Sequence, residues 1–411
     1  METGVMLARY RQACVLVAVG IFFTNFANYA ERWGLIPLYW VIFLAGLTTP
    51  LLIAALALPR LQVRPLAWWG AGFLLMSIAW YFPSRQDEVA YQEVQTRILS
   101  VIFLMLMLFL FARPEEQRLA RAGVALAQVL AISLNVYELF HPLTFSKIPG
   151  RSSGLFENSN QSGAALMLGM ILSYGVVPAR LRVPFIIATG VGILTTFTRS
   201  AMLGWIVVVI FLAVRGGFDV QRLRAIIIGG LVVIGFIFSP AWHHLEQTLE
   251  ERGALNLSVL DRLAFFSTGR VSDASANERF AVVAEAWRLF TERPFTGYGT
   301  GAARTIPGFS VSTHNIYVFL LVDHGILGLA IIAGLLATTL WGANRRTADV
   351  TGPFALFLIM WGFFSHNVLE ERYILLAVAL VASMVASARY EHAEERKGAP
   401  DLAPAHAMVV A

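Results

Sequence analysis

The sequence predicts an all-α integral membrane protein with about twelve transmembrane helices. Of its 411 residues, 57% are hydrophobic and only 14% are charged, whereas a soluble domain carries about 25% charged residues. The apolar residues form separate long runs, and about 20 apolar residues are needed to cross the ~30 Å of hydrocarbon in a bilayer. One soluble core would not divide the sequence in this way, so we expect a bundle of spanning helices.

Windows of this length recur along the whole chain and define the predicted spans. They lie near 12–30, 35–58, 65–82, 96–112, 118–140, 161–178, 183–198, 200–215, 223–240, 315–341, 351–368 and 372–389. Arginine and lysine are concentrated in alternate connections, and each predicted inside segment carries at least two of them. Because basic residues remain on the cytoplasmic side, both termini are predicted inside.

Several classes of protein are excluded by what the sequence lacks. No basic helix interleaved with stacking aromatic residues is present, so no nucleic acid is expected as a partner. Cys14 is the single cysteine and cannot form an intrachain disulfide. The pair His243-His244 has no nearby Asp or Cys, which makes a metal site improbable. Neither a phosphate-binding loop nor a dinucleotide fingerprint occurs, and we expect no cofactor.

The predicted organisation has four parts. Residues 1–240 hold the first nine spans, 241–313 form one large outside loop, 314–389 hold the last three spans, and 390–411 form a disordered cytoplasmic tail. Within the loop, the apolar residues between Asn277 and Arg293 recur at three- and four-residue steps and predict an amphipathic helix. A weaker pattern covers 242–266. Such helices could cover a cavity in the bundle or rest on the bilayer surface.

Three residues on the outside face are candidates for chemistry. Arg199 lies between two apolar runs and either extends towards the membrane surface or offers its guanidinium to phosphate oxygens. Arg279 opens the amphipathic helix, where it is either solvated or bound to an anionic partner, because a cation is unfavourable near a helix N-terminus. His314 follows the loop and is either an interfacial polar residue or a general base.

Two polar segments on the same face are candidates for substrate contacts. The segment 154–161 contains Asn158 and Asn160, which could cap the next helix or bind sugar hydroxyls. The connection after the eleventh span contains His366, Asn367, Glu370, Glu371 and Arg372. It is either an interfacial turn or a source of a carboxylate, such as Glu370, that orients His314 or a substrate hydroxyl. Together these residues suit an anionic, membrane-embedded substrate that arrives already activated, such as a lipid pyrophosphate.

An ordered set of motifs resembles the bacterial O-antigen ligase and polymerase superfamily. Its parts are Thr198-Arg199-Ser200, the loop from Gly154 to Asn160, the helix from Arg279 to Pro294, the turn Gly297-Tyr298-Gly299 and His314-Asn315-x-Tyr317. The resemblance extends in motif detail over residues 150–330. Asp323 stands where relatives commonly carry Glu.

The resemblance implies an inverting glycosyltransferase with a membrane fold of the GT-C kind, using neither metal nor cofactor. It would transfer O-antigen from an undecaprenyl pyrophosphate donor to a lipid A–core acceptor at the periplasmic face of the bacterial inner membrane. By this resemblance His314 is the base, and Arg199 and Arg279 hold the pyrophosphate. The implied substrate-binding residues are Asn158, Asn160, Gly297, Gly299, Asn315, Tyr317 and Glu370.

Three other functions are compatible with these residues. An O-antigen polymerase would share the donor and the topology. Protein oligosaccharyltransferases also belong to the superfamily that these motifs resemble. A transporter of polyprenyl-linked glycans would instead carry ionisable residues in the middle of its spans and broken helices near the midplane. Here the predicted charges lie at span ends on one side, which favours the enzyme.

Overall fold

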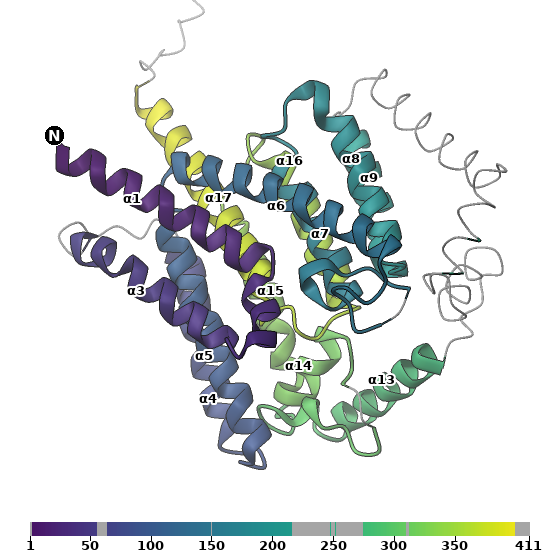
Figure 1. Ribbon diagram of the computed structural model, residues 1–411. Helices are drawn as coiled ribbons and strands as arrows, with labels where there is room; N and C mark the ends of the chain where they lie inside the picture. Colours follow the sequence, from purple (N-terminus) through teal and green to yellow (C-terminus); the bar gives the residue numbers. More distant parts are fainter. Residues whose placement is uncertain are drawn as a thin grey trace, which may run out of the picture.

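The computed structural model is a single helical bundle (Figure 1). It describes residues 2–55, 64–148, 150–215, 274–309 and 312–398, together with the single positions 247 and 251. Within these ranges all regular structure is helical. The predicted all-α class is therefore confirmed. The weaker pattern at 242–266, the pair His243-His244 and the predicted span 223–240 lie outside the described residues, apart from the two single positions.

The elements are named in chain order. The first half contains α1 (Glu2–Ala18), η1 (Val19–Phe23), α2 (Phe26–Tyr29), η2 (Ala30–Trp33), α3 (Pro37–Ala55), α4 (Arg64–Tyr81), α5 (Glu88–Leu110), α6 (Pro114–Phe140), η3 (Gly154–Phe156), α7 (Ser159–Ser173), η4 (Ala179–Leu181), α8 (Arg182–Thr195) and α9 (Arg199–Val214). The second half contains α13 (Ala274–Glu292), η5 (Ala302–Arg304), α14 (Ile316–His324), η6 (Gly325–Leu327), α15 (Gly328–Thr339), α16 (Ala348–Gly362) and α17 (Arg372–Gly398).

Six helical segments in the described part of the chain are long and apolar enough to cross a membrane. They are Gly4–Phe23, Pro37–Ala54, Glu88–Leu110, Pro114–Phe140, Ile316–Thr339 and Arg372–His392. The chain is thus an α-helical membrane protein. Each predicted window within the described residues contains a helix, but α7, α8, α9 and α16 have only 14 to 16 residues. The sequence predicted about twelve spans. Among the described residues, six helical segments meet both the length and the composition needed to cross a membrane.

Two helices form the centre of the bundle because they are apolar on every face. α17 runs through the middle in yellow in Figure 1 and packs against α5, α6, α7 and α15. All its residues from Tyr373 to Ala382 are buried. α7 is buried from Ser162 to Ser173. α17 also continues past residue 389 to Gly398, so the start of the predicted disordered tail is helical.

The predicted amphipathic loop helix is confirmed as α13, which begins at Ala274. Arg279 therefore lies in its second turn and not its first, so the expected conflict with the helix dipole does not arise. α13 packs along α14. The predicted span 315–341 is bent at Gly325, where φ is +62°, into α14 and α15. A Cβ on Gly328 would lie 2.2 Å from the carbonyl oxygen of Leu320, so the backbone is tightly packed at this bend.

One end of the bundle collects the polar residues. It is formed by the connections α4–α5, α6–α7, α8–α9 and α16–α17, together with α13 and the start of α14, and we call it the site end. Side chains join neighbouring parts of this end directly: Arg151 Nη2 in the α6–α7 connection donates to Thr198 Oγ1 in the α8–α9 connection at 3.2 Å, and Gln161 Nε2 at the start of α7 donates to Glu371 in the α16–α17 connection. The orientation predicted from the basic residues would place this end outside the cytoplasm.

Candidate active site

His314 occupies the turn between the loop and α14. Its φ is +48°, a left-handed conformation that few residues other than glycine adopt. The side chain is half-buried, and its ring lies 5.3 Å from the ring of His366 in an edge-to-face arrangement. Burial, and then the positive charge of Arg279, lower the pKa of His314 below its usual value of 6.5. The imidazole is therefore neutral at pH 7 and can accept a proton.

The two predicted arginines reach the site end from different helices. Arg279 projects from α13 and is close enough to influence the charge of His314. Arg199 is the first residue of α9, which packs against α16. Gly204 in the first half of α9 lies against Met360 near the end of α16, and Gly352 near the start of α16 lies against Phe211 near the end of α9. The two helices therefore run antiparallel. This register places Arg199 at the same end as the C-terminus of α16.

Asn315 and Tyr317 hold the start of α14. The Asn315 side chain accepts hydrogen bonds from the backbone N–H groups of Tyr317 at 3.0 Å and Val318 at 3.2 Å, which satisfies two donors at the helix N-terminus. The Tyr317 hydroxyl donates to the carbonyl oxygen of Ile359 at 2.7 Å and so ties α14 to α16. The polar groups predicted to bind substrate thus have defined roles in positioning the helix that follows His314.

The predicted asparagines of segment 154–161 also stabilise a helix start. Asn158 caps α7 by accepting a hydrogen bond from the Asn160 backbone N–H at 2.9 Å. The Asn160 side-chain oxygen accepts from the Arg151 guanidinium, which also donates to Thr198 Oγ1 at 3.2 Å. Arg151 was not among the predicted site residues, yet it is buried between the α6–α7 and α8–α9 connections. Arg151 thus places Thr198, and with it the adjacent Arg199, beside segment 154–161.

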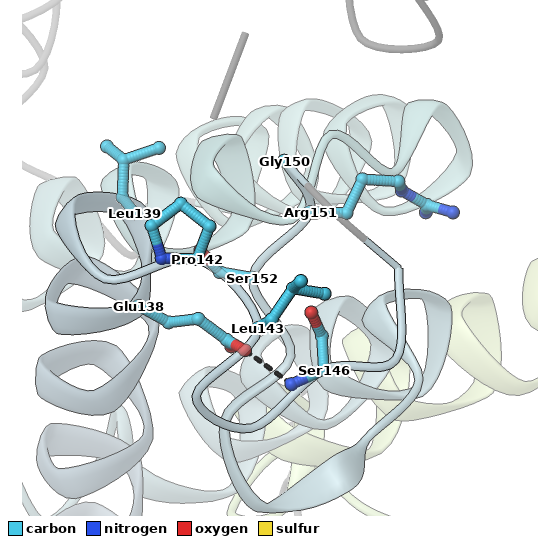
Figure 2. Close-up of a pocket in the computed structure, with 8 residues that line it drawn as sticks. All are labelled: Glu138, Leu139, Pro142, Leu143, Ser146, Gly150, Arg151 and Ser152. Carbon is cyan, nitrogen blue, oxygen red and sulfur yellow. Dashed lines mark hydrogen bonds between the residues drawn. The ribbon is translucent and has the colours of Figure 1, made fainter. Parts of the chain in front are cut away.

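Glu138 organises the loop that precedes these asparagines (Figure 2). Its buried carboxylate accepts hydrogen bonds from four backbone N–H groups, those of Phe145, Ser146, Ser153 and Gly154. Figure 2 shows the carboxylate turned towards Ser146, whereas the Arg151 side chain points away from it. A buried charge is stable where several N–H groups point at it. Sequence reasoning missed this residue, although a glutamate at the end of an apolar helix is an available signal.

The glycine turn packs against the bend between α14 and α15. A Cβ on Gly297, where φ is +63°, would lie 2.5 Å from the Asp323 carbonyl oxygen. A Cβ on Gly299 would lie 2.5 Å from the Ser84 backbone. The Asp323 carboxylate accepts hydrogen bonds from the backbone N–H groups of Gly301 at 3.1 Å and Ala303 at 2.9 Å. Gly297 and Gly299 were predicted to contact substrate. In the structure they let the backbone of the turn approach the backbones of Asp323 and Ser84, and the Asp323 carboxylate holds the turn in place.

A buried charge network lies behind this turn. Arg97 of α5 donates to Glu93 at 2.8 Å and to Asp323 at 2.6 Å, and its Nη1 lies 2.6 Å from His324 Nε2. Arg97 lies at the edge of the predicted window 96–112, but it is buried inside the bundle because α5 begins earlier, at Glu88. Glutamate and arginine four residues apart in a helix form a natural pair. That spacing was the signal available in the sequence.

Arg304 connects the network to the α16–α17 connection. Its guanidinium donates to Glu93 at 2.8 Å, to Asn367 Oδ1 at 3.0 Å and to Glu370. Burial, followed by the negative charge of Glu93, raises the pKa of Glu370 to about 7. Glu370, predicted to contact substrate, is thus a partner of Arg304. Sequence reasoning did not single out Arg304, since nothing in its immediate neighbourhood marks it.

His366 links this network to His314. The Phe319 ring lies stacked against His366 at 5.6 Å, and the Arg304 guanidinium lies 5.1 Å from the centre of the same Phe319 ring. Burial, then the charge of Arg304, lower the pKa of His366 to about 3. The structure thus brings together His314, Arg279 and the α16–α17 connection.

In the described ranges, no group of three or more His, Cys, Asp or Glu side chains is arranged to hold a metal ion. What the site end offers is a neutral imidazole beside arginines from separate helices. Such a combination can take a proton from a hydroxyl group while stabilising an anion.

Part of the chain matches a known protein family. The fold and the site define an α-helical membrane protein with a neutral histidine and arginines at one end of its bundle. Residues 184–333 match a family model described as O-Antigen ligase. The matched region contains Arg199, Arg279 and His314. The resemblance to the O-antigen ligase superfamily is confirmed over these residues. No curated protein matches the chain.

Proposed function

We propose that the protein is an inverting glycosyltransferase that transfers O-antigen polysaccharide from undecaprenyl pyrophosphate to lipid A–core oligosaccharide. The observation that carries the proposal is His314, a half-buried imidazole that burial and Arg279 keep neutral. It lies within the region that matches the O-antigen ligase family. In this proposal the site end faces the periplasm from the bacterial inner membrane.

The proposed reaction is a single displacement. The free ring nitrogen of His314 accepts the proton of the acceptor sugar hydroxyl as that oxygen attacks the anomeric carbon of the donor. The bond from the anomeric carbon to the pyrophosphate oxygen breaks, and polyprenyl pyrophosphate leaves with the electron pair. Because one attack occurs from the face opposite the leaving group, the anomeric configuration is inverted. The donor is already activated, so the step requires no nucleotide.

The two arginines act on the leaving group. The guanidinium groups of Arg199 and Arg279 would bind the pyrophosphate oxygens with paired hydrogen bonds. Their stabilisation grows as negative charge develops on the leaving oxygen. Asn158, Asn160, Asn315 and Tyr317 support the surrounding walls through the capping and packing contacts described above. The proposal places the sugars against these walls and the glycine turn.

The first prediction tests His314. The purified chain in lipid nanodiscs is incubated with lipid-pyrophosphate-linked O-antigen and lipid A–core, without ATP or added metal. We expect the wild type to form laddered lipopolysaccharide and His314→Ala to lose at least about 100-fold in rate, because loss of a general base costs about 10²- to 10⁴-fold. His141→Ala is the matched control, since His141 is exposed at the same end of the bundle. Its rate should equal that of the wild type.

Other outcomes distinguish the alternatives. A wild-type protein that lengthens the donor glycan when no core is present would be an O-antigen polymerase. If neither acceptor receives sugar, the enzyme proposal fails, and a transport assay for the donor lipid becomes the next experiment. A His314→Ala protein that retains the wild-type rate would show that another residue is the base.

A further inference from the structure

A second histidine faces the proposed base, and it has no part in the reaction described above. His366 and His314 each precede an asparagine at the site end, His314 just before α14 and His366 within the α16–α17 connection. The two rings meet edge to face, at an interplanar angle of 71°. Such a contact between two ionisable rings is expected to affect the chemistry of both.

His366 is buried and firmly held, yet one of its nitrogens is unsatisfied. Its side chain is 9% exposed and stacks on Phe319 at an interplanar angle of 23°. Within the described part of the chain, His366 Nδ1 has no hydrogen-bond partner. Leaving a buried polar atom unpaired is destabilising. A phenylalanine would fill the same space without this cost, so packing alone does not explain a histidine here.

The surroundings of His366 determine what its nitrogens can do. The charged and titratable groups that influence it are Arg304 from η5, His314 from the start of α14 and Glu93 from α5. Burial and the Arg304 charge keep the ring neutral across the physiological range. A neutral imidazole always has one nitrogen that accepts a hydrogen bond, whereas a protonated one has none. His366 is therefore a permanent acceptor beside His314.

The separation of the two rings suits a shared hydrogen bond. Two imidazoles joined by an N–H···N bond of ~2.9 Å have ring centres roughly 5 Å apart, and the observed separation is 5.3 Å. Catalytic hydrogen bonds often shorten only when substrate is bound. A base held by a third group is also the general arrangement of activated catalytic side chains.

We propose that His366 is the positioning residue of His314. In the reacting complex, one ring nitrogen of His366 accepts the ring N–H of His314, which turns the other nitrogen of His314 towards the attacking hydroxyl. When that nitrogen takes the proton, the resulting imidazolium remains hydrogen-bonded to His366. The inference rests on the proposed role of His314 as the base.

The experiment compares two substitutions of His366 in the full-length chain in nanodiscs. His366→Phe preserves the ring and its contacts with Phe319 but removes both nitrogens. We expect kcat to fall about 10- to 100-fold, while KM for donor and acceptor changes less than about threefold. His366→Asn places a side-chain oxygen close to the position of Nδ1 and should recover part of kcat. His141→Phe is the matched control and should leave both constants unchanged.

A second measurement does not depend on turnover. The chain has eight histidines, so the imidazole nitrogens can be resolved by NMR after ¹⁵N labelling, and His314 is assigned from its loss in His314→Gln. We expect one tautomer of His314 in the wild type and in His366→Asn, and a mixture of both in His366→Phe. A purely structural role for His366 would not change the tautomer.

The outcomes separate this inference from the proposed function. If His366→Phe turns over at the wild-type rate with a single His314 tautomer, the positioning role is wrong while His314 can still be the base. An effect on KM alone would also overturn it, because it would indicate direct contact with substrate. If His314→Ala retains the wild-type rate, the proposed function itself fails, whatever the His366 variants do.

Discussion

Individual residues at the site end owe their properties to partners that are distant in the chain. Glu371 is an example: its buried carboxyl accepts a hydrogen bond from Gln161, and burial, followed by the charge of Glu370, raises its pKa to about 8. At pH 7 this carboxyl is therefore protonated. His314 shows the opposite case, in which burial, followed by the positive charge of Arg279, lowers the pKa and keeps the imidazole neutral at pH 7.

The pH dependence of activity is predicted from this last pair. Because the proposed base must be neutral, activity should be lost as pH falls through the pKa of His314, which lies below 6.5. Arg279→Gln removes a neighbouring positive charge, so the pKa of His314 should rise towards 6.5. Arg288→Gln on the same helix is the control, because Arg288 is exposed and pairs with Glu285 and Glu292.

The measurement is an NMR titration of His314 in the three proteins. It follows the proton on His314 directly and does not require the Arg279 variant to be active. A pKa that falls in Arg279→Gln, or that moves equally in Arg288→Gln, would contradict a local effect of Arg279.

At the scale of elements, the short helices surround the site. α7, α8, α9 and α16 have 14 to 16 residues, which corresponds to roughly 21–24 Å and is less than the ~30 Å of hydrocarbon. Their termini include Asn158, Arg199 and Gly362 at the site end. Irregular backbone is tolerated at membrane depth where protein or water surrounds it. We expect the site to lie partly below the membrane surface.

The glycine turn should be sensitive to substitution because its backbone touches the α14–α15 bend. Gly297→Ala combines a positive φ with contact to the Asp323 backbone and should lower stability by several kcal/mol, about 1–2 kcal/mol of it from backbone conformation. Gly308→Ala is the control, since Gly308 has φ +82° but nothing within 4 Å of a Cβ. Thermal unfolding in detergent should give Tm in the order wild type, Gly308→Ala, Gly297→Ala. Equal Tm values for the two variants would contradict the contact.

For the whole molecule, the polar site end and the basic residues define an orientation. The connections that carry Arg85 and His314 are predicted outside, and the connection between α15 and α16 is predicted inside. The buried Cys14 is the single cysteine, so a Cys14→Ser background permits single-cysteine labelling.

Labelling with a membrane-impermeant maleimide tests this orientation. The exposed positions Arg85→Cys and Ala343→Cys form the matched pair. We expect Arg85→Cys to react in intact spheroplasts and Ala343→Cys to react only after permeabilisation. The reverse pattern would place His314 in the cytoplasm and remove the basis for a periplasmic acceptor.

The sequence by itself determined the helical class, the amphipathic helix now seen as α13, and the motif around His314, because these depend on local composition and periodicity. Tertiary structure decided the chemistry around that motif. Arg97 meets Asp323, Arg304 meets Glu93 and Glu370, and His314 meets His366. These pairs join distant segments, and their contacts depend on how helices are packed and where they bend. A single sequence carries the residues for such a network, but only the packing of α5, α14 and the α16–α17 connection brings their side chains into contact.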